Sequence, residues 1–390
     1  MANINPIGID QTTGQQRPVS SNDSVVNNLG AEIAVGVIPT GDFSENPNIV
    51  NLLNPWGDPQ ILTSPASMPP SISRICQFSP GGEYLAITQS STRPFLYQRV
   101  GTSFYKLDDP ASIVSTETFD LSWSNNGGEF LAFANNGTPG IHIYQRSGSI
   151  FTKLANPTSM PTGLPIGIAW SPTVEFLAVA HATAPFLTIY QRSGTTLTAI
   201  TAPSSLPSAQ GEKVRWAPDG EFFAVVTDGA PWLGIYQRTG LTSFTRLSDP
   251  ASLPTSRSDN LAWSPNSQFL SLAGGGVGGK LINYQRSGTT FTRLSDPASL
   301  IGAAGIAWSP DGNFLAVSQG TGTPAFGIYQ KSGTTFTFLA SPSSLPAGAW
   351  GPNWSNDQKF LAVADNSAPF MTLYQSGESM PSSGVVINWQ

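Results

Sequence analysis

An internal repeat of 45 to 47 residues constrains this chain more than any other feature. An aromatic residue followed by a polar turn recurs seven times, and a Tyr-Gln pair recurs in step with it. The aromatic anchors are Phe78, Trp123, Trp170, Trp216, Trp263, Trp308 and Trp354, and the paired tyrosines are Tyr97, Tyr144, Tyr190, Tyr236, Tyr284, Tyr329 and Tyr374. Because two independent anchors keep one period, the repeat fixes the architecture before any local pattern is considered.

Within each repeat, four short runs are separated by turn residues. In residues 305–346 these runs are "GIAW", "FLAVS", "FGIYQ" and "TFTFL", which are rich in the β-branched and aromatic residues that strands prefer. The intervening "SPDG" and "KSGTT" pieces suit tight turns, since Pro presets φ and Gly accepts positive φ. Four antiparallel strands in about 45 residues are typical of a propeller blade. The sequence therefore predicts an all-β, seven-bladed β-propeller.

The ends of the repeat region predict how the ring closes. Residues 59–69, "PQILTSPASMP", match the segment that elsewhere follows the Tyr-Gln pair, whereas no such segment follows Tyr374. We therefore expect a strand around Ile61 and Leu62 to complete the seventh blade and remove the exposed sheet edges. The predicted organisation is an extended arm (1–50), one propeller (51–376) and a tail strand (377–390). The apolar run 31–39 is expected to form a strand that pairs with 384–390 or with another chain.

Composition excludes several classes of protein. The chain has 390 residues, 39 Gly, 33 Pro, one Cys and a net charge of −6. A lone Cys76 cannot form an internal disulfide, and an acidic chain without a basic cluster does not favour nucleic acid or anionic lipid. The first twenty residues lack the pattern of a secretory signal, and no apolar run is long enough to span a membrane.

The repeat resembles a known class of propeller. Residues 170–198, "WSPTVEFLAVAHATAPFLTIYQRSGTTLT", resemble the WD-type repeats found in bacterial and bacteriophage proteins, and the resemblance covers residues 59–376. Tyr-Gln stands where the eukaryotic pattern has Trp-Asp, and no Gly-His opens the blade. Residues 4–29 resemble the amino-terminal segments of phage fibre and appendage proteins. The resemblance implies an arm that anchors the protein in a virion and joins chains, with a trimer expected; the alternative is a polar, partly disordered leader.

Catalytic and metal-binding residues are scarce. The chain has only two histidines, His142 and His181, and no thiol pair, so neither a His-rich metal site nor a Ser-His-Asp set stands out. The Gly-rich stretch 274–279 has no helix after it and is interpreted as a loop, not a phosphate site. We expect no catalytic residue, no metal and no cofactor.

Ten of the 18 basic residues occupy repeated positions, after the Tyr-Gln pair or on the fourth strand of a blade. Such regular side chains are expected to cover apolar surface or to pair with nearby Asp. Function is better sought where blades differ, because a repeat fixes the scaffold and leaves its loops free to vary. The longer loops should emerge on one face, which we call the long-loop face.

Two sets of candidate binding residues lie on this face. The residue ending each second strand varies and could form a polar ring at the channel mouth: Gln89, Asn135, His181, Thr227, Gly274, Gln319 and Asp365. Phe186, Trp232 and Phe370 follow just beyond, unless they merely start the next strand and pack between blades. The distinctive loops of blades 4 and 5 add Glu212, Lys213, Asp228, Arg257 and Asp259. Aromatic platforms with carboxylate acceptors suit a host-surface glycan or a protein.

Together these features predict a non-enzymatic virion structural protein. The propeller would be displayed on a phage tail or appendage, mounted on other virion proteins through residues 1–50, and would mediate attachment to the host. Two alternatives stay open. One is a head or neck decoration protein that contacts other virion proteins, and the other is a glycan-cleaving enzyme, disfavoured because no independent carboxylate pair stands out.

Overall fold

The computed structural model describes residues 3–4, 23–26, 32–33, 56, 59–274, 280–298, 302–320, 322–339, 341–342, 345–346, 348–376 and 386–389. The chain divides into two compact units. The larger is Ile61–Gln375, and the smaller combines Met1–Gln60 with Ser376–Gln390. Within the described residues, no helix has the length and apolar character needed to cross a bilayer.

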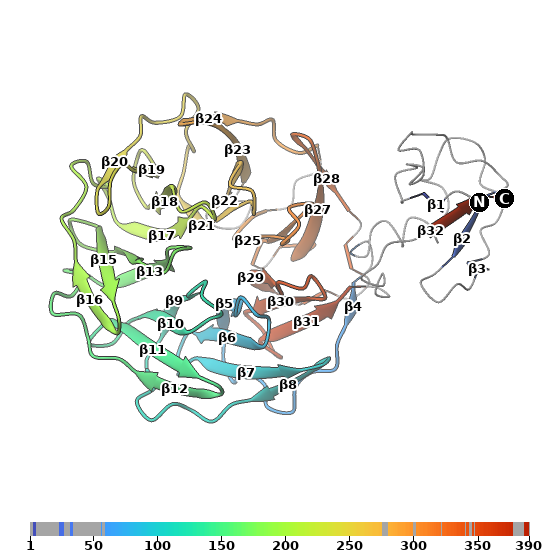
Figure 1. The fold of residues 1–390 in the computed structure, drawn as a ribbon, viewed down its shortest axis with the longest axis horizontal. Coiled ribbons are helices and arrows are strands. Elements are labelled where there is room, and N and C mark those ends of the chain that lie inside the picture. Colours follow the sequence, from blue (N-terminus) through green and yellow to red (C-terminus); the bar gives the residue numbers. More distant parts are fainter. Residues whose placement is uncertain are drawn as a thin grey trace. The chain divides into compact units, whose positions relative to one another are not determined.

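The larger unit confirms the predicted seven-bladed β-propeller, with seven four-stranded antiparallel sheets arranged in a ring (Figure 1). Blade 1 comprises β5 (Ser73–Phe78), β6 (Tyr84–Gln89), β7 (Phe95–Val100) and β8 (Ser103–Lys106). Blade 2 comprises β9 (Thr118–Trp123), β10 (Phe130–Asn135), β11 (Ile141–Ser147) and β12 (Ile150–Lys153). Blade 3 comprises β13 (Pro165–Trp170), β14 (Phe176–His181), β15 (Leu187–Ser193) and β16 (Thr196–Ala199). Blade 4 comprises β17 (Gly211–Trp216), β18 (Phe222–Thr227), β19 (Leu233–Arg238) and β20 (Phe244–Arg246).

The remaining blades follow the same order. Blade 5 comprises β21 (Ser258–Trp263), β22 (Phe269–Gly274), β23 (Leu281–Ser287) and β24 (Thr290–Arg293). Blade 6 comprises β25 (Gly305–Trp308), β26 (Phe314–Ser318), β27 (Phe326–Ser332) and β28 (Thr335–Phe338). Blade 7 comprises β29 (Ala349–Trp354), β30 (Phe360–Asp365), β31 (Met371–Gln375) and β4 (Gln60–Ile61).

Burial explains why the strands of a blade have different sequence patterns. Every residue of β14, "FLAVAH", is buried, because neighbouring blades cover both faces of a second strand. A continuous apolar run is the pattern expected of such a strand. The outermost strand β16 instead buries only Leu197 completely, since one of its faces meets solvent. The core therefore lies between blades.

The aromatic anchors are core residues, as expected, with 4–8 % of their surface exposed. Their indoles also join blades: Trp123 Nε1 donates to the Gln77 carbonyl at 3.0 Å, and Trp263 Nε1 to the Arg215 carbonyl at 3.1 Å. The tyrosines of the Tyr-Gln pairs are completely or almost completely buried. The two anchors thus recur because each has a fixed place in every blade.

The repeated basic residues cover aromatic rings of the preceding blade, which confirms the expected scaffold role. The Arg192 guanidinium lies 4.8 Å from the centre of the Phe130 ring, and Arg286 lies 4.3 Å from that of Phe222. Equivalent contacts occur at Arg99, Arg146, Arg238 and Lys331. A cation over a ring adds about 0.5–2 kcal/mol, depending on how far it is desolvated.

The predicted ring closure is also confirmed. Strand β4 is hydrogen-bonded to β31, and the Leu62 N–H donates to the Leu373 carbonyl at 2.8 Å. The first blade then packs on the seventh, where the buried Cys76 thiol donates to the Gly351 carbonyl. Because the last blade takes its outer strand from the start of the ring, neither end leaves an open sheet edge.

The smaller unit contains a sheet of order β1-β32-β2-β3. Its strands are β1 (Asn3–Ile4), β2 (Asp23–Val26), β3 (Glu32–Ile33) and β32 (Val386–Trp389). The carboxy-terminal strand β32 pairs with β1 and β2, whereas β3, within the predicted strand 31–39, pairs with β2. Direct pairing of 31–39 with 384–390 was therefore a wrong expectation, because β2 lies between β3 and β32, whereas pairing with another chain stays a prediction.

Candidate functional site

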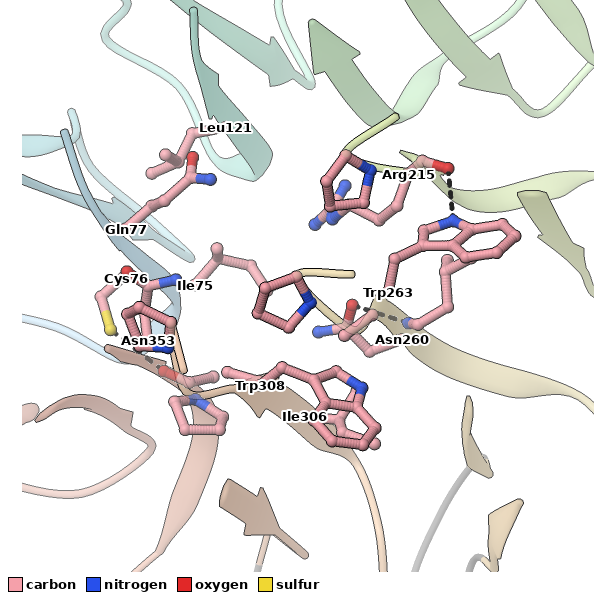
Figure 2. A pocket seen from close by; sticks show the side chains of 18 of the residues that line it. Ile75, Cys76, Gln77, Leu121, Arg215, Asn260, Trp263, Ile306, Trp308 and Asn353 are labelled. Atoms are coloured by element: carbon pink, nitrogen blue, oxygen red, sulfur yellow. Dashed lines mark hydrogen bonds between the residues drawn. The ribbon is translucent and has the colours of Figure 1, made fainter. Parts of the chain in front are cut away.

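The central channel is lined by the first strand of each blade, and its side chains differ strongly between blades. Three positions before each anchor stand Ile75, Asp120, Gly167, Lys213, Asn260, Gly305 and Gly351. One position before each anchor stand Gln77, Ser122, Ala169, Arg215, Ala262, Ala307 and Asn353. A cavity of about 450 Å³ lies in the channel, with Gln77, Arg215, Asn260 and Asn353 among its walls (Figure 2).

A β-bulge near the start of the first strand adds a further residue to the channel wall in six blades. In blades 2, 3, 4, 5 and 7 the extra residues are Phe119, Ile166, Glu212, Asp259 and Trp350. Bulges change the direction of a side chain and often lie beside functional sites. With Arg74 of blade 1, these residues define what we call the channel mouth, at the end of the inner strands on the long-loop face.

An ion cluster spans the channel between blades 2 and 4. Asp120 is fully buried and accepts from both terminal nitrogens of Arg215, at 2.7 and 2.8 Å, and from the Ile168 N–H at 3.0 Å. Lys213 Nζ lies 4.0 Å from the same carboxylate. Burial alone would raise the pKa of Asp120, but the Arg215 and Lys213 cations hold it below its usual range. The cluster thus keeps a carboxylate ionised inside the channel.

Arg74 organises one side of the channel mouth. Its guanidinium lies 6.0 Å from the centre of the Phe119 ring and 5.8 Å from that of Trp350. The same group pairs with Glu117 at 2.8 Å. Trp350 is half-buried, and its Nε1 has no hydrogen-bond partner. This side of the mouth therefore combines a cation, two aromatic rings and one unused donor.

Carboxylates occupy the side of the mouth formed by blades 4 and 5. Arg257 pairs with Asp259 at 2.7 Å and lies 3.6 Å from Glu212. Burial alone would lower the pKa of Arg257, but Asp259, Glu212 and Asp228 together hold it above its usual value. These four candidates from the sequence are thus gathered into one sector of the long-loop face.

Three amides face the channel, and each of their oxygens already accepts one hydrogen bond. Gln77 Oε1 accepts from the Trp123 N–H at 3.2 Å, and Asn353 Oδ1 accepts from the Phe78 N–H at 2.8 Å. Asn260 Oδ1 accepts from the Leu261 N–H at 2.9 Å. Each amide oxygen keeps a second lone pair, and each amide nitrogen carries two N–H donors. The cavity can hold a ligand that offers acceptor atoms.

The other predicted site residues do not join one surface. His181 and Asp365 are buried, and Lys213 points inward, where its Nζ donates to the Phe119 and Ile166 carbonyls. Phe186, Trp232 and Phe370 are half-buried residues of three different blades. All three have a positive φ of 65–70°, a conformation that costs a bulky residue about 1–3 kcal/mol.

The expected polar ring at the end of the second strands does not surround the channel mouth. Six of its members, including Gln89 and Asn135, are buried. Their side chains bond the nearby loops or the next strand instead: Gln89 Oε1 accepts from the Ser71 hydroxyl, Asn135 Oδ1 from the Gly137 N–H and Asp365 Oδ2 from the Thr372 hydroxyl. The seventh, Gly274, precedes residues 275–279, so the predicted Gly-rich loop lies largely outside the described residues. These positions vary because each holds a different loop.

Sequence reasoning missed the most distinctive residues of the channel: Arg74, Asp120 and Arg215, together with Asn260 and Asn353. A signal was present, because each replaces the small or apolar residue that most blades have one, three or four positions before the anchor. These positions lie on the inner strands and not in the loops, where the binding residues were expected. In the described part of the chain, no group of three His, Cys, Asp or Glu side chains could hold a metal ion.

Solved structures share this architecture. The β-propeller domain of Cps50 (Swd1) from Myceliophteria thermophila has a TM-score of 0.61 at 12 % identity, covering 81 % of this chain and 99 % of that one. Hydrazine synthase from Kuenenia stuttgartiensis gives 0.60 at 13 %, covering 82 % and 100 %. A chain of the mitotic checkpoint complex gives 0.59 at 16 %, covering 82 % and 98 %.

These likenesses and the sheet topology show that the chain has the fold of the seven-bladed β-propellers, the fold that WD-type repeats form. At 12–16 % identity they concern the fold alone. No protein-family model and no curated protein matches the sequence. What this particular propeller does must therefore be argued from its own residues.

Proposed function

We propose that the protein is a non-enzymatic attachment propeller of a bacteriophage particle. Residues 1–50 mount it on other virion proteins, and the long-loop face of blades 4 and 5 contacts a glycan or protein of the host surface. Two features support a separation of roles. Residues 1–60 and 376–390 form a compact unit distinct from the propeller, and residues 4–29 resemble virion-anchoring arms.

One observation carries the choice of face. The anchors, the arginines over aromatic rings and the tight turns repeat around the ring, whereas Glu212, Arg257 and Asp259 occur together in one sector only. Asp228 acts on Arg257 and belongs to the same sector, and the half-buried Trp232 follows it four residues later in the loop after β18. In a repeat protein, a group of residues with no counterpart in the other blades marks the binding surface better than the scaffold does.

The location on the particle tests the first part of the proposal. We would label the protein on purified virions and compare the full chain with a variant lacking residues 1–50. Labelling at the tail that disappears without the arm, with cell binding by the shortened protein retained, is the expected result. A capsid location with no cell binding would instead identify a decoration protein.

Substitutions at the sector test the second part. Replacing Trp232 and Asp228 with Ala should weaken binding to host cells by about 5- to 100-fold, the usual loss when a central interface residue is truncated. Asn366→Ala, at the position of Asp228 in blade 7, is the matched control and should bind like the original protein. Unchanged binding by the double variant would show that this sector is not the attachment surface.

A further inference from the structure

A second cavity, of about 290 Å³, lies in blade 4. Its walls come from residues 205–208 of the loop before β17, from the β18–β19 connection and from the start of β19. Arg246 at the end of β20 and Asp249 beyond that strand complete them. We call it the blade-4 pocket. It is contiguous with the loop that carries Asp228 and Trp232, because Thr227 and Pro231 line it.

A glycine holds the pocket open. Gly234 lies in β19 at a position where blades 1, 2, 3, 5 and 7 have a larger side chain, namely Phe95, His142, Thr188, Ile282 and Thr372, and blade 6 has Gly327. A Cβ atom there would lie 3.2 Å from Tyr236 Cε2 and 3.5 Å from Arg246 Nε. The missing side chain thus leaves space beside two groups that can bind a ligand.

The Tyr236 hydroxyl lies 3.7 Å from the point where a Cβ of Gly234 would stand. In blades 1, 2, 3 and 5 the equivalent tyrosine donates to a loop carbonyl at 2.7–2.9 Å, for example Tyr190 to Ser159. Tyr236 is just as buried, but its hydroxyl donates to no loop carbonyl, and the Arg246 guanidinium is the group beside it. The corresponding loop residue in blade 4, Ser205, lines the pocket instead. A buried hydroxyl proton without an acceptor is unfavourable, so a ligand atom that accepts from it is bound more tightly.

The charges of the pocket favour an uncharged ligand. Arg246 forms an ion pair with Asp249, so the two formal charges cancel. The lining offers a guanidinium donor and a carboxylate acceptor beside the apolar Leu206, Pro207 and Leu233. The phenolic hydroxyl of Tyr236 lies next to the lining residue Gly234. Burial raises the pKa of Tyr236, so its hydroxyl keeps its proton and can donate.

We propose that the blade-4 pocket binds a single ring of a neutral, hydroxylated ligand, of the hexopyranose class. Tyr236 donates to one ligand oxygen, and the Arg246–Asp249 pair offers a donor and an acceptor to neighbouring hydroxyls. The volume lies at the lower end of small-molecule sites, which suits one ring and not an extended chain. The inference rests on the proposed function, since it names the glycan unit that a host surface would present.

The test uses the full-length protein and a panel of probes: methyl glucoside, methyl galactoside, methyl mannoside and, as the anionic counterpart, glucuronate. Saturation-transfer NMR should detect at least one neutral glycoside. Gly234→Thr, which fills the pocket, should abolish the signal, whereas Gly327→Thr, at the same position in blade 6, should leave it unchanged. Tyr236→Phe should weaken binding by about 2- to 10-fold, the value of one hydrogen bond.

Unfolding measurements separate lost binding from lost structure. Tyr236→Phe removes no bond to a loop carbonyl, so its midpoint urea concentration should stay close to that of the original protein. Tyr190→Phe loses its bond to Ser159 and should unfold at a lower one. The proposal is overturned if no neutral glycoside binds, if Gly234→Thr binds like the original, or if glucuronate binds more tightly. If a glycoside bound but the protein did not attach to host cells, the proposed function would be rejected. The assignment of the blade-4 pocket as a glycoside site would still hold.

Discussion

At the scale of single residues, one position shows how burial decides protonation. His181 and Asp365 end the second strands of blades 3 and 7, and each meets a threonine of the next strand. His181 Nε2 lies 3.0 Å from Thr188 Oγ1, and Asp365 Oδ2 accepts from Thr372 at 2.7 Å. Burial lowers the pKa of His181 and raises the pKa of Asp365 to about 7. Both side chains are thus held toward their neutral forms.

Asp365 should make the fold less stable as the pH rises. Its folded pKa of about 7 exceeds the ordinary 3.8, so its contribution is fully present below 3.8 and is lost between there and about 7. Asp365→Asn keeps the shape and cannot ionise, and Asn135 already occupies this position in blade 2.

We therefore expect Asp365→Asn to raise the free energy of unfolding by about 1–3 kcal/mol above neutral pH, the penalty of a buried polar group left unsatisfied. The gain should shrink toward pH 4 or so, where the carboxyl is protonated in the folded protein. Thermal unfolding of both proteins across this range measures the difference. Equal melting temperatures above neutral pH would contradict the assignment.

At the scale of strands, β17 ties distant blades together. Its Lys213 and Arg215 both act on Asp120 of β9, so blade 4 is joined to blade 2 past blade 3. Gly167 of β13 makes room for this, because a Cβ there would lie 2.7 Å from Lys213 Cα. The ion cluster consequently depends on a glycine in the strand between its two partners.

Removing Asp120 should be strongly destabilising. Asp120→Ala leaves Arg215 and Lys213 without their buried partner and should cost about 3–5 kcal/mol of unfolding free energy. Glu117→Ala is the matched control, since it breaks the more exposed pair with Arg74 and should cost about 1 kcal/mol or less. Urea unfolding distinguishes the two. Equal losses would mean that the cluster stabilises no more than a surface pair does.

At the scale of the whole molecule, the ring depends on a short closing strand. In blade 7, the first strand of the propeller in chain order, β4, pairs with the last, β31. Every other blade is built from one continuous segment of sequence. Ring closure therefore depends on one strand of two residues, β4.

Two truncations should separate the arm from the closing strand. Deleting residues 1–50 keeps β4, and we expect the propeller to retain its melting temperature. Deleting residues 1–66 removes β4 and exposes an edge of β31, so we expect a lower melting temperature and a tendency to aggregate. Circular dichroism and light scattering measure both effects. If both truncations behaved alike, blade 7 would not need its borrowed strand.

The sequence predicted the ring, the number of blades and the closing strand because these depend on side chains that repeat. It did not predict the channel site. Asp120 and Arg215 are 95 residues apart, and their meeting depends on ring geometry, on a bulge and on Gly167. The Tyr236 hydroxyl was equally hidden, since its residue matches the repeat and only the missing loop contact sets it apart.

The borrowed strand also decides how the molecule carries a mechanical load. The chain leaves the ring through β4 and through β31, which are neighbours in blade 7. Beyond the ring, the carboxy-terminal β32 pairs with β1 and β2 from the amino-terminal side. A pull on a tether attached at either end is therefore shared by both exits and enters the ring at one blade. Blade 7 therefore takes the load first. Blades 4 and 5 do not lie on the direct path between the two exits.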